Sequence, residues 1–122
     1  IVIRTNYSNP PTHGGTIVSM VLNDPKLFAL WDKELAGMRD RIRLMRTQLV
    51  DKLKEYGATQ DFSFVKAQRG MFSYSGMTAA QVDRLREEHG IYAVSSGRIC
   101  VAALNSGNID AVAKAIAAVL KG

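Results

Sequence analysis

The chain has 122 residues, of which 47% are hydrophobic and 22% are charged, and its formal net charge is +5. This length and composition fit one modest soluble domain, which would bury about two-thirds of the surface of the unfolded chain. No apolar run reaches the ~20 residues that a membrane-spanning helix needs, and the single cysteine, Cys100, excludes an internal disulfide. We therefore expect a cytoplasmic protein with no membrane partner.

The positive charge is concentrated in the segment 39–54, which holds four arginines and two lysines. A basic surface can indicate nucleic-acid binding, but aromatic residues do not interleave with these side chains to form a platform on which bases could stack. We interpret these side chains instead as a solvated face of one long helix, so we expect no nucleic-acid partner.

The first two predicted elements follow from local signals. Residues 1–12 are expected to be extended, because two adjacent prolines disfavour a helix there. An apolar run over 16–23 predicts a short helix. Asp24 followed by Pro25 predicts the start of the next helix, since aspartate caps a helix and proline fits its first turn.

A long amphipathic helix is predicted over 24–57. Apolar side chains recur there at steps of three or four residues from Trp31 to Tyr56, which places them on one stripe. Gly57 supplies a typical helix end. A helix of this length either bridges two domains or pairs with a partner helix.

Beyond the long helix the pattern changes to short strands. Segments rich in β-branched and aromatic residues predict four of them: 62–67, 71–76, 91–94 and 98–102. Together with two covering helices, these strands would make a small layer over 58–122. The predicted fold class is therefore α/β.

The two covering helices have recognisable ends. The sequence TAAQ over 78–81 has capping-box spacing, and Met77 and Val82 occupy the positions of a hydrophobic staple. This helix should end at Gly90. A last helix, rich in alanine, should begin near Asn108.

Arg98 is the first candidate for binding a ligand. It opens a predicted strand, and the small side chains of Cys100 and Ala102 share its face. A planar guanidinium can hold a carboxylate through two hydrogen bonds, and small neighbours leave room for that ligand. On spacing alone, however, an ordinary exposed arginine at a strand edge is the better explanation.

Other residues carry weaker signals. Arg4 lies in the polar extended segment and Phe72 in a predicted strand, where ordinary loop and core roles explain them well. His13 and His89 have no carboxylate or cysteine at ligand spacing, so we predict no metal site. The sequence holds no Ser-His-Asp or Cys-His arrangement and no P-loop.

Three segments are more specific together than apart. The aspartate and aromatic amino-acid aminotransferases contain, in the same order and spacing, segments similar to IRTNYSNPPTHGG, DRIRLMRTQLVDKL and QRGMFSYSGMTAAQVDRLREEHGIYAVSSGRICVAALN. The chain thus resembles the C-terminal part of a class I pyridoxal-phosphate-dependent aminotransferase. The resemblance implies a remnant of the large cofactor domain at 1–23, the inter-domain helix at 24–57 and the small C-terminal α/β domain of fold type I at 58–122.

The resemblance also implies roles for four residues. Arg98 is similar to the family arginine that holds the α-carboxylate of the substrate, and Phe72 to a phenylalanine that lines the substrate pocket. Arg4 resembles the arginine that reaches across a homodimer to bind the distal carboxylate of a dicarboxylic substrate. Asn9 lies near the same boundary and is expected to contribute to substrate binding.

Two motifs of the family do not occur in this sequence. The family's Schiff-base lysine sits in a serine-lysine motif followed by an arginine that binds the cofactor phosphate, and none of the seven lysines here lies in such a motif. Since the chain also opens on Ile1 inside an extended segment, we expect an internal piece of a longer enzyme, inactive when isolated. The pyridoxal 5'-phosphate site and every catalytic residue would lie outside it.

The substrate stays open at this stage. The resemblance implies amino-group transfer between an aromatic or dicarboxylic amino acid and a 2-oxo acid such as 2-oxoglutarate. QRGMFSYSG and GRICVA look closer to bacterial aromatic aminotransferases, whereas Asn9 fits the aspartate branch. The alternative is a non-catalytic binding or interaction domain. We also expect the isolated chain to self-associate through its apolar helix faces.

Overall fold

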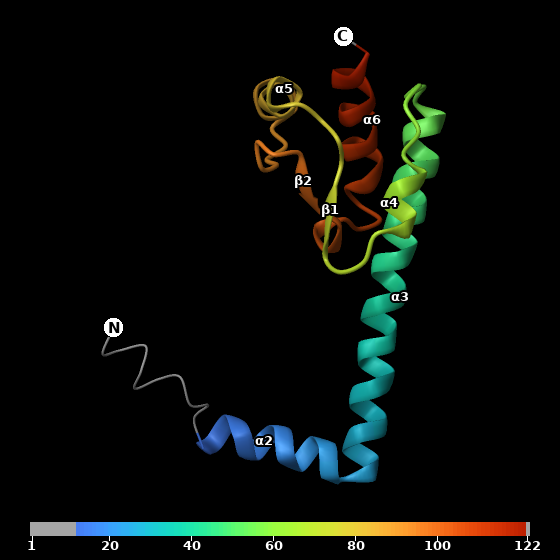
Figure 1. The fold of residues 1–122 in the computed structure, drawn as a ribbon. Helices are drawn as coiled ribbons and strands as arrows, with labels where there is room; N and C mark the ends of the chain where they lie inside the picture. Colours follow the sequence, from blue (N-terminus) through green and yellow to red (C-terminus); the bar gives the residue numbers. More distant parts are fainter. Residues whose placement is uncertain (1–11, 122) are drawn as a thin grey trace, which may run out of the picture. The chain divides into compact units, whose positions relative to one another are not determined.

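The computed structural model describes residues 12–121, and Figure 1 shows its helices and strands. In chain order the elements are α2 (Thr12–Asn23), α3 (Pro25–Glu55), α4 (Ser63–Ala67), β1 (Phe72–Tyr74), α5 (Ala79–His89), β2 (Arg98–Cys100), the short helix η1 (Val101–Ala103) and α6 (Ile109–Leu120). The chain divides into two compact units, Ile1–Arg39 and Asp40–Gly122. Among the described residues, no helix combines the length and hydropathy that a membrane crossing requires.

The helix α2 ends at Asn23 as predicted but begins earlier than expected. The sequence predicted a helix from residue 16, whereas α2 starts at Thr12. The expectation of extended structure over 1–12 is wrong for Thr12, and its other residues lie outside the described part of the chain. The Thr16 hydroxyl donates to the carbonyl of Thr12 at 2.8 Å, which ties the first turn together.

The helix α3 begins and ends at the predicted signals. The Asp24 carboxylate accepts hydrogen bonds from the backbone N–H groups of Lys26 at 2.8 Å and Leu27 at 3.1 Å, so it satisfies two donors that a helix start leaves free. Gly57 follows the last turn with a φ of 79°. This left-handed conformation is one that glycine adopts without strain and that commonly ends a helix.

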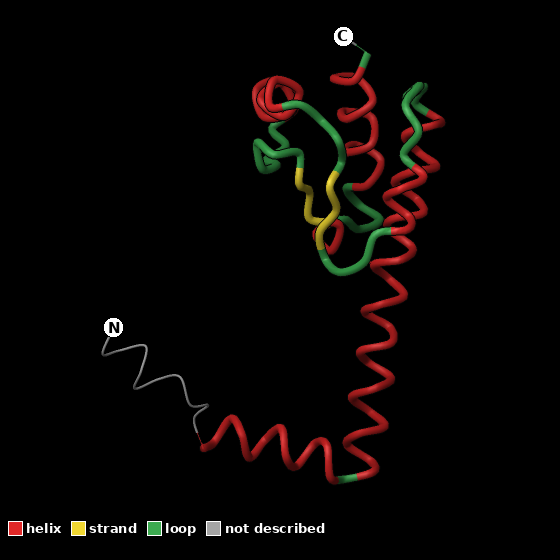
Figure 2. Tube along the Cα trace, in the orientation of Figure 1, coloured by secondary structure: helices red, strands yellow, loops and turns green. Residues whose placement is uncertain are grey.

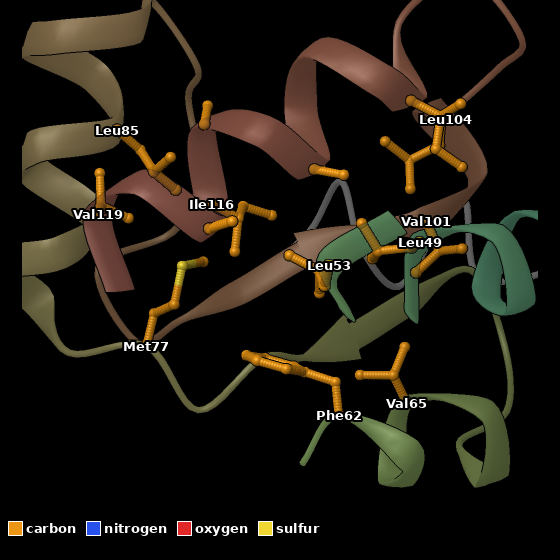
Figure 3. Packing of buried hydrophobic residues seen from close by; sticks show 14 of the residues in the cluster. Leu49, Leu53, Phe62, Val65, Met77, Leu85, Val101, Leu104, Ile116 and Val119 are labelled. Carbon is orange, nitrogen blue, oxygen red and sulfur yellow. The ribbon is translucent and has the colours of Figure 1, made fainter. Parts of the chain in front are cut away.

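The hydrophobic core lies in the second unit and is shown in Figure 3. From α3 it takes Met45, Leu49 and Leu53, which recur every four residues and are each no more than 4% exposed. They meet buried side chains of α4, α5, η1 and α6: Val65, Val82, Leu85, Val101, Ile109, Ala113, Ala115, Ile116, Ala117 and Val119. Burying one such large aliphatic side chain contributes about 1.5–3 kcal/mol, so this stripe fastens the end of α3 to the small layer.

The helix α5 confirms the predicted capping box. The Thr78 hydroxyl accepts from the Gln81 N–H at 3.3 Å, and the Gln81 side-chain oxygen accepts from the Thr78 N–H at 2.9 Å. Met77 and Val82, at the staple positions, are both buried. The helix stops at Gly90, whose φ of 65° is left-handed.

The sheet is smaller than predicted. Figure 2 shows its two short strands, β1 and β2, which pair antiparallel with Phe72 opposite Cys100, Ser73 opposite Ile99 and Tyr74 opposite Arg98. The strand predicted over 98–102 ends at Cys100 because the next residues turn into η1.

Two predicted strands are wrong. Residues 62–67 contain the helix α4, because the buried residues Phe62 and Val65 are three positions apart while Phe64 is exposed. That burial period fits a helix rather than a strand. The segment 91–94 forms no strand. The Ile91 N–H donates to the Leu85 carbonyl of α5, and the Val94 N–H donates to the Arg98 carbonyl.

Candidate carboxylate-binding site

Arg98 and Phe72 lie on adjacent strands and meet diagonally across the sheet. The guanidinium carbon of Arg98 is 5.0 Å from the centroid of the Phe72 ring, within the ~6 Å at which a cation is attracted to an aromatic face. Both side chains are exposed, whereas Ser73 points the other way and is buried. Among the described residues no carboxylate pairs with Arg98. Its donors are therefore not engaged by an acidic side chain of the described residues.

The turn before Arg98 requires glycine at its last position. Gly97 has a φ of 80°, and a Cβ placed there would lie 2.7 Å from the backbone oxygen of Met77. Its carbonyl accepts from the N–H of Ser75 at 2.9 Å and from the Ser75 hydroxyl at 2.6 Å. These bonds anchor the start of β2 to the end of β1, so they fix where the Arg98 side chain emerges.

A cavity of about 410 Å³ adjoins the Arg98–Phe72 pair. Cys100 belongs to its lining, and Tyr92 and Val94 contribute from the segment before β2. The helix α5 adds Leu85, and α6 adds Val112 and Ile116. Within residues 12–121, Arg98 is the only charged residue of that lining. A low-dielectric wall beside one cation strengthens its attraction for an anion.

Arg46 of α3 supports β1 from the outer side. Its Nη1 donates to the Val65 carbonyl at 3.0 Å and to the Ser73 hydroxyl at 2.9 Å, and its Nη2 donates to the carbonyls of Gly70 and Phe72, both at 2.8 Å. Arg46 is only 3% exposed, so its charge is solvated by these protein oxygens in place of water.

The buried position also changes the acidity of Arg46. Burial, and to a lesser degree the positive charge of Arg69, lowers the pKa of the Arg46 guanidinium from its ordinary value. An arginine side chain nevertheless stays protonated in a protein. The four hydrogen bonds are therefore charge-assisted, a type that typically contributes more than neutral ones.

Arg46 corrects the prediction that the basic residues of the long helix form a solvated face. A usable signal was present, because Arg46 lies four residues after Ile42 and three before Leu49. That spacing puts it on the apolar stripe of the helix rather than opposite it. Arg43, by contrast, is exposed and pairs with Asp40 at 3.3 Å, as a solvated face would predict.

Two further side chains hold the same strands. The Gln68 oxygen accepts from the N–H of Tyr74 at 3.0 Å, and its amide nitrogen donates to the Tyr74 carbonyl at 3.2 Å. Arg41 donates to the carbonyls of Ala102 and Leu104, each at 2.8 Å. Neither residue carried a signal in the sequence, because both act on backbone oxygens that are remote along the chain.

Comparison with known proteins decides the family. The sequence profile of the family described as "Aminotransferase class I and II" matches residues 1–116. The chain belongs to the class I and II aminotransferases. The predicted resemblance and the predicted α/β fold are therefore confirmed.

Members of both substrate branches are similar to this aminotransferase chain. It is 66% identical over 119 residues to an aspartate aminotransferase of Pseudomonas aeruginosa, covering 98% of this chain and 30% of that protein. It is 52% identical over 118 residues to an aromatic-amino-acid aminotransferase of Escherichia coli, covering 97% of this chain and 30% of that protein.

A solved aminotransferase structure is also similar to this chain. The aromatic-amino-acid aminotransferase of Burkholderia pseudomallei, described as covalently bound to pyridoxal phosphate, superposes with a TM-score of 0.91 at 72% identity. The match covers 98% of this chain and 30% of that one. The aminotransferase chain thus spans about 30% of the length of these relatives.

The structure brings together two of the four predicted site residues, Arg98 and Phe72. Arg4 and Asn9 lie outside the described residues, so their roles stay predictions.

The described residues do not fit pyridoxal phosphate itself. That cofactor needs a lysine amine for its aldehyde and a cradle of donors for its phosphate. No lysine lines the cavity at Arg98 within the described part of the chain. Lys52 and Lys66 pair with carboxylates at 2.5 and 2.8 Å, and Lys121 donates to the Tyr56 carbonyl at 2.7 Å. Arg98 and the apolar lining of its cavity fit a carboxylate ligand instead.

Proposed function

We propose that this chain supplies the carboxylate-binding side of the active site of a pyridoxal-phosphate-dependent aminotransferase. The whole enzyme would move an amino group between an amino acid and a 2-oxo acid such as 2-oxoglutarate. One observation carries the proposal: the Arg98 guanidinium rests on the Phe72 ring beside an apolar cavity, and no described carboxylate pairs with it.

Arg98 would bind the α-carboxylate through two parallel hydrogen bonds. A guanidinium stays charged across the working range of pH, and its planar fork matches the two carboxylate oxygens. The Phe72 ring supports one face of the fork and so limits the directions in which it can rotate. Binding in a single orientation would also fix the other bonds at the substrate's Cα, which lowers the entropic cost of reaction.

Proton transfer is proposed to come from the family's Schiff-base lysine, which lies outside this chain. The described residues that line the cavity include no lysine, histidine, aspartate or glutamate. This region would therefore bind and orient the substrate, while its aliphatic walls keep water from competing for the carboxylate.

The substrate is proposed to be an aromatic or a dicarboxylic amino acid. The aromatic choice is supported by the 72% identity to the solved aromatic-amino-acid aminotransferase, and the aspartate choice by the 66% identity to the bacterial aspartate aminotransferase. Arg4 and Asn9 are proposed to complete the site for a distal carboxylate across a homodimer. The resemblance alone supports that part of the proposal, as it does a cytoplasmic location.

A hybrid enzyme tests the proposal directly. In it, the 119 matching residues of the Pseudomonas aeruginosa aspartate aminotransferase are replaced by this chain. Transamination by the hybrid is measured with aspartate and with an aromatic amino acid, with 2-oxoglutarate as acceptor. The isolated chain is the negative control and should show no turnover.

Arg98→Ala in the hybrid should lower kcat/KM by about 10²–10⁴-fold, because two hydrogen bonds to a charged carboxylate are lost. Arg86→Ala is the matched control, since Arg86 is an exposed arginine that pairs only with acidic neighbours of α5. An equal effect of the two substitutions would refute the proposed role of Arg98. A hybrid that binds 2-oxoglutarate without turnover would favour a non-catalytic binding domain.

A further inference from the structure

The backbone of β1 has two sides with different partners. On the inner side, the Met71 carbonyl accepts from Ala102 at 3.2 Å and the Ser75 N–H donates to Gly97 at 2.9 Å. Bonds along an antiparallel strand alternate between its two sides. The carbonyls of Gly70, Phe72 and Tyr74 therefore point away from β2, where a two-stranded sheet offers no further strand.

Two side chains take the place of that missing strand. Arg46 binds the carbonyls of Gly70 and Phe72 with one nitrogen, and Gln68 binds both the N–H and the carbonyl of Tyr74. The carboxamide of Gln68 thus forms the pair of bonds that a neighbouring strand would form. Phe72, which carries the ring beneath Arg98, lies between these two supports.

The helix α3, which carries Arg46, also binds the residues that follow β2. Arg41, about 1.4 turns before Arg46 on α3, binds the carbonyls of Ala102 and Leu104. Charged side chains of α3 thus bind β1, which carries Phe72. They also bind the residues that follow β2, the strand of Arg98. We call Arg41 and Arg46 the helix clamp.

We propose that Arg46, assisted by Arg41, is a positioning residue for the carboxylate site. It acts through the β1 backbone to hold the Phe72 ring where the Arg98 guanidinium can lie against it. This inference rests on the proposed function of Arg98. It adds that the geometry of the Arg98–Phe72 pair is set by a helix that contributes no residue to the cavity.

Arg46 can position β1 because its planar guanidinium forms hydrogen bonds in fixed directions. Arg46 is fixed by four acceptors from three different segments, so its guanidinium has one orientation. Lysine carries the same charge but lacks the planar fork, and can reach only some of these oxygens. A displacement of about 1 Å at a binding group can cost a factor of ~10² in rate, so a loosened β1 should be visible in substrate affinity.

The test uses the hybrid enzyme with four substitutions: Arg46→Met, Arg46→Lys, Arg41→Met and Arg43→Met. KM, kcat and the thermal unfolding midpoint are measured for each. Arg46→Met should raise KM about 10–100-fold with a smaller fall in kcat, and Arg46→Lys should recover part of that loss. Arg41→Met should raise KM less, and Arg43→Met, which removes an exposed arginine of the same helix, should leave KM unchanged.

A purely structural role predicts a different pattern. In that case Arg46→Met would lower the unfolding midpoint but leave the KM of the folded enzyme unchanged, and the inference would be overturned. Where Arg46→Met does not fold, Arg46→Lys and Arg41→Met decide the question, since unchanged KM values in both overturn it.

Arg98→Ala in the same hybrid separates the two proposals. If Arg98→Ala raises KM while the clamp variants do not, only the positioning role fails. If Arg98→Ala also leaves KM unchanged, the proposed function fails, and the positioning role fails with it.

Discussion

The helices α2 and α6 have the same length and a similar apolar character, yet they differ completely in burial. Each has 12 residues. In α6 six side chains are buried, whereas in α2 none is. The exposed side chains of α2 include Ile17, Val18, Met20 and Leu22, each about half exposed or more. Hydropathy therefore predicts a helix in both places, but burial depends on whether other elements of the same unit surround it.

Shortening one apolar side chain in each helix should show this difference most strongly. Ile116 of α6 is 2% exposed and Val18 of α2 is 58% exposed. Ile116→Ala should lower the free energy of unfolding of the second unit by about 2–5 kcal/mol, while Val18→Ala should change it by less than about 0.5 kcal/mol. Urea titration followed by circular dichroism measures both. Equal losses would contradict the burial that distinguishes the helices.

The exposed face of α2 should also determine how the isolated chain associates. Replacing Val18 and Leu22 by serine should weaken self-association about 10-fold, because apolar area no longer leaves water in the complex. Sedimentation of wild-type and variant chains over a range of concentrations gives the dissociation constants. The control is Lys114→Ser on the solvent side of α6, which is expected to have no effect. A wild-type chain that stays monomeric at high concentration would refute the prediction.

A small pH effect should distinguish α6 from α2. Asp110 lies in its first turn, and a hydrogen bond from Lys52, then one from Tyr56, lower the pKa of the Asp110 carboxyl. A lowered folded-state pKa means that the stabilisation is present above the unfolded value near pH ~4 and is lost as pH falls through the folded value. The first turn of α2 has no acidic residue.

Thermal unfolding from pH 6 to pH 2 measures this contribution. Asp110→Asn should remove a small part of the acid dependence of the second unit, since Asp110 is exposed, Lys52 is partly exposed, and ion pairs at the surface contribute little. Asp83→Asn is a suitable control, because Asp83 and its partner Arg86 both lie on α5 and not on α6. Identical acid dependence in wild type and Asp110→Asn would show that the Lys52 contact has no energetic role.

The parts of the fold that were predictable depend on neighbouring residues. The Asp24 cap, the capping box at 78–81 and the end of α5 at Gly90 all follow from groups within a few positions of one another. The strand predictions at 62–67 and 91–94 were wrong because composition does not reveal whether a segment finds a partner strand.

The site shows the same division. The family resemblance implied that Arg98 and Phe72 both serve the substrate site, but it did not predict their contact, and spacing alone favoured an exposed strand-edge arginine. Gly97 is explained only by the approach of Met77, which is remote in sequence. Arg46 was misjudged because a basic residue on a helix is usually solvated, and its four acceptors come from segments that meet only in the folded unit.

The side chains that complete the outer edge of β1 have a consequence for aggregation. A row of free N–H and C=O groups at a sheet edge is a template on which strands of other molecules can add, and this is one route to amyloid fibres. In the described part of the chain, Arg46 already binds the carbonyl of Phe72 on that side, and Gln68 binds both the N–H and the carbonyl of Tyr74. A second molecule would have to displace a buried guanidinium before it could add a strand there. Strand addition at this edge of β1 is thereby hindered even in the isolated chain.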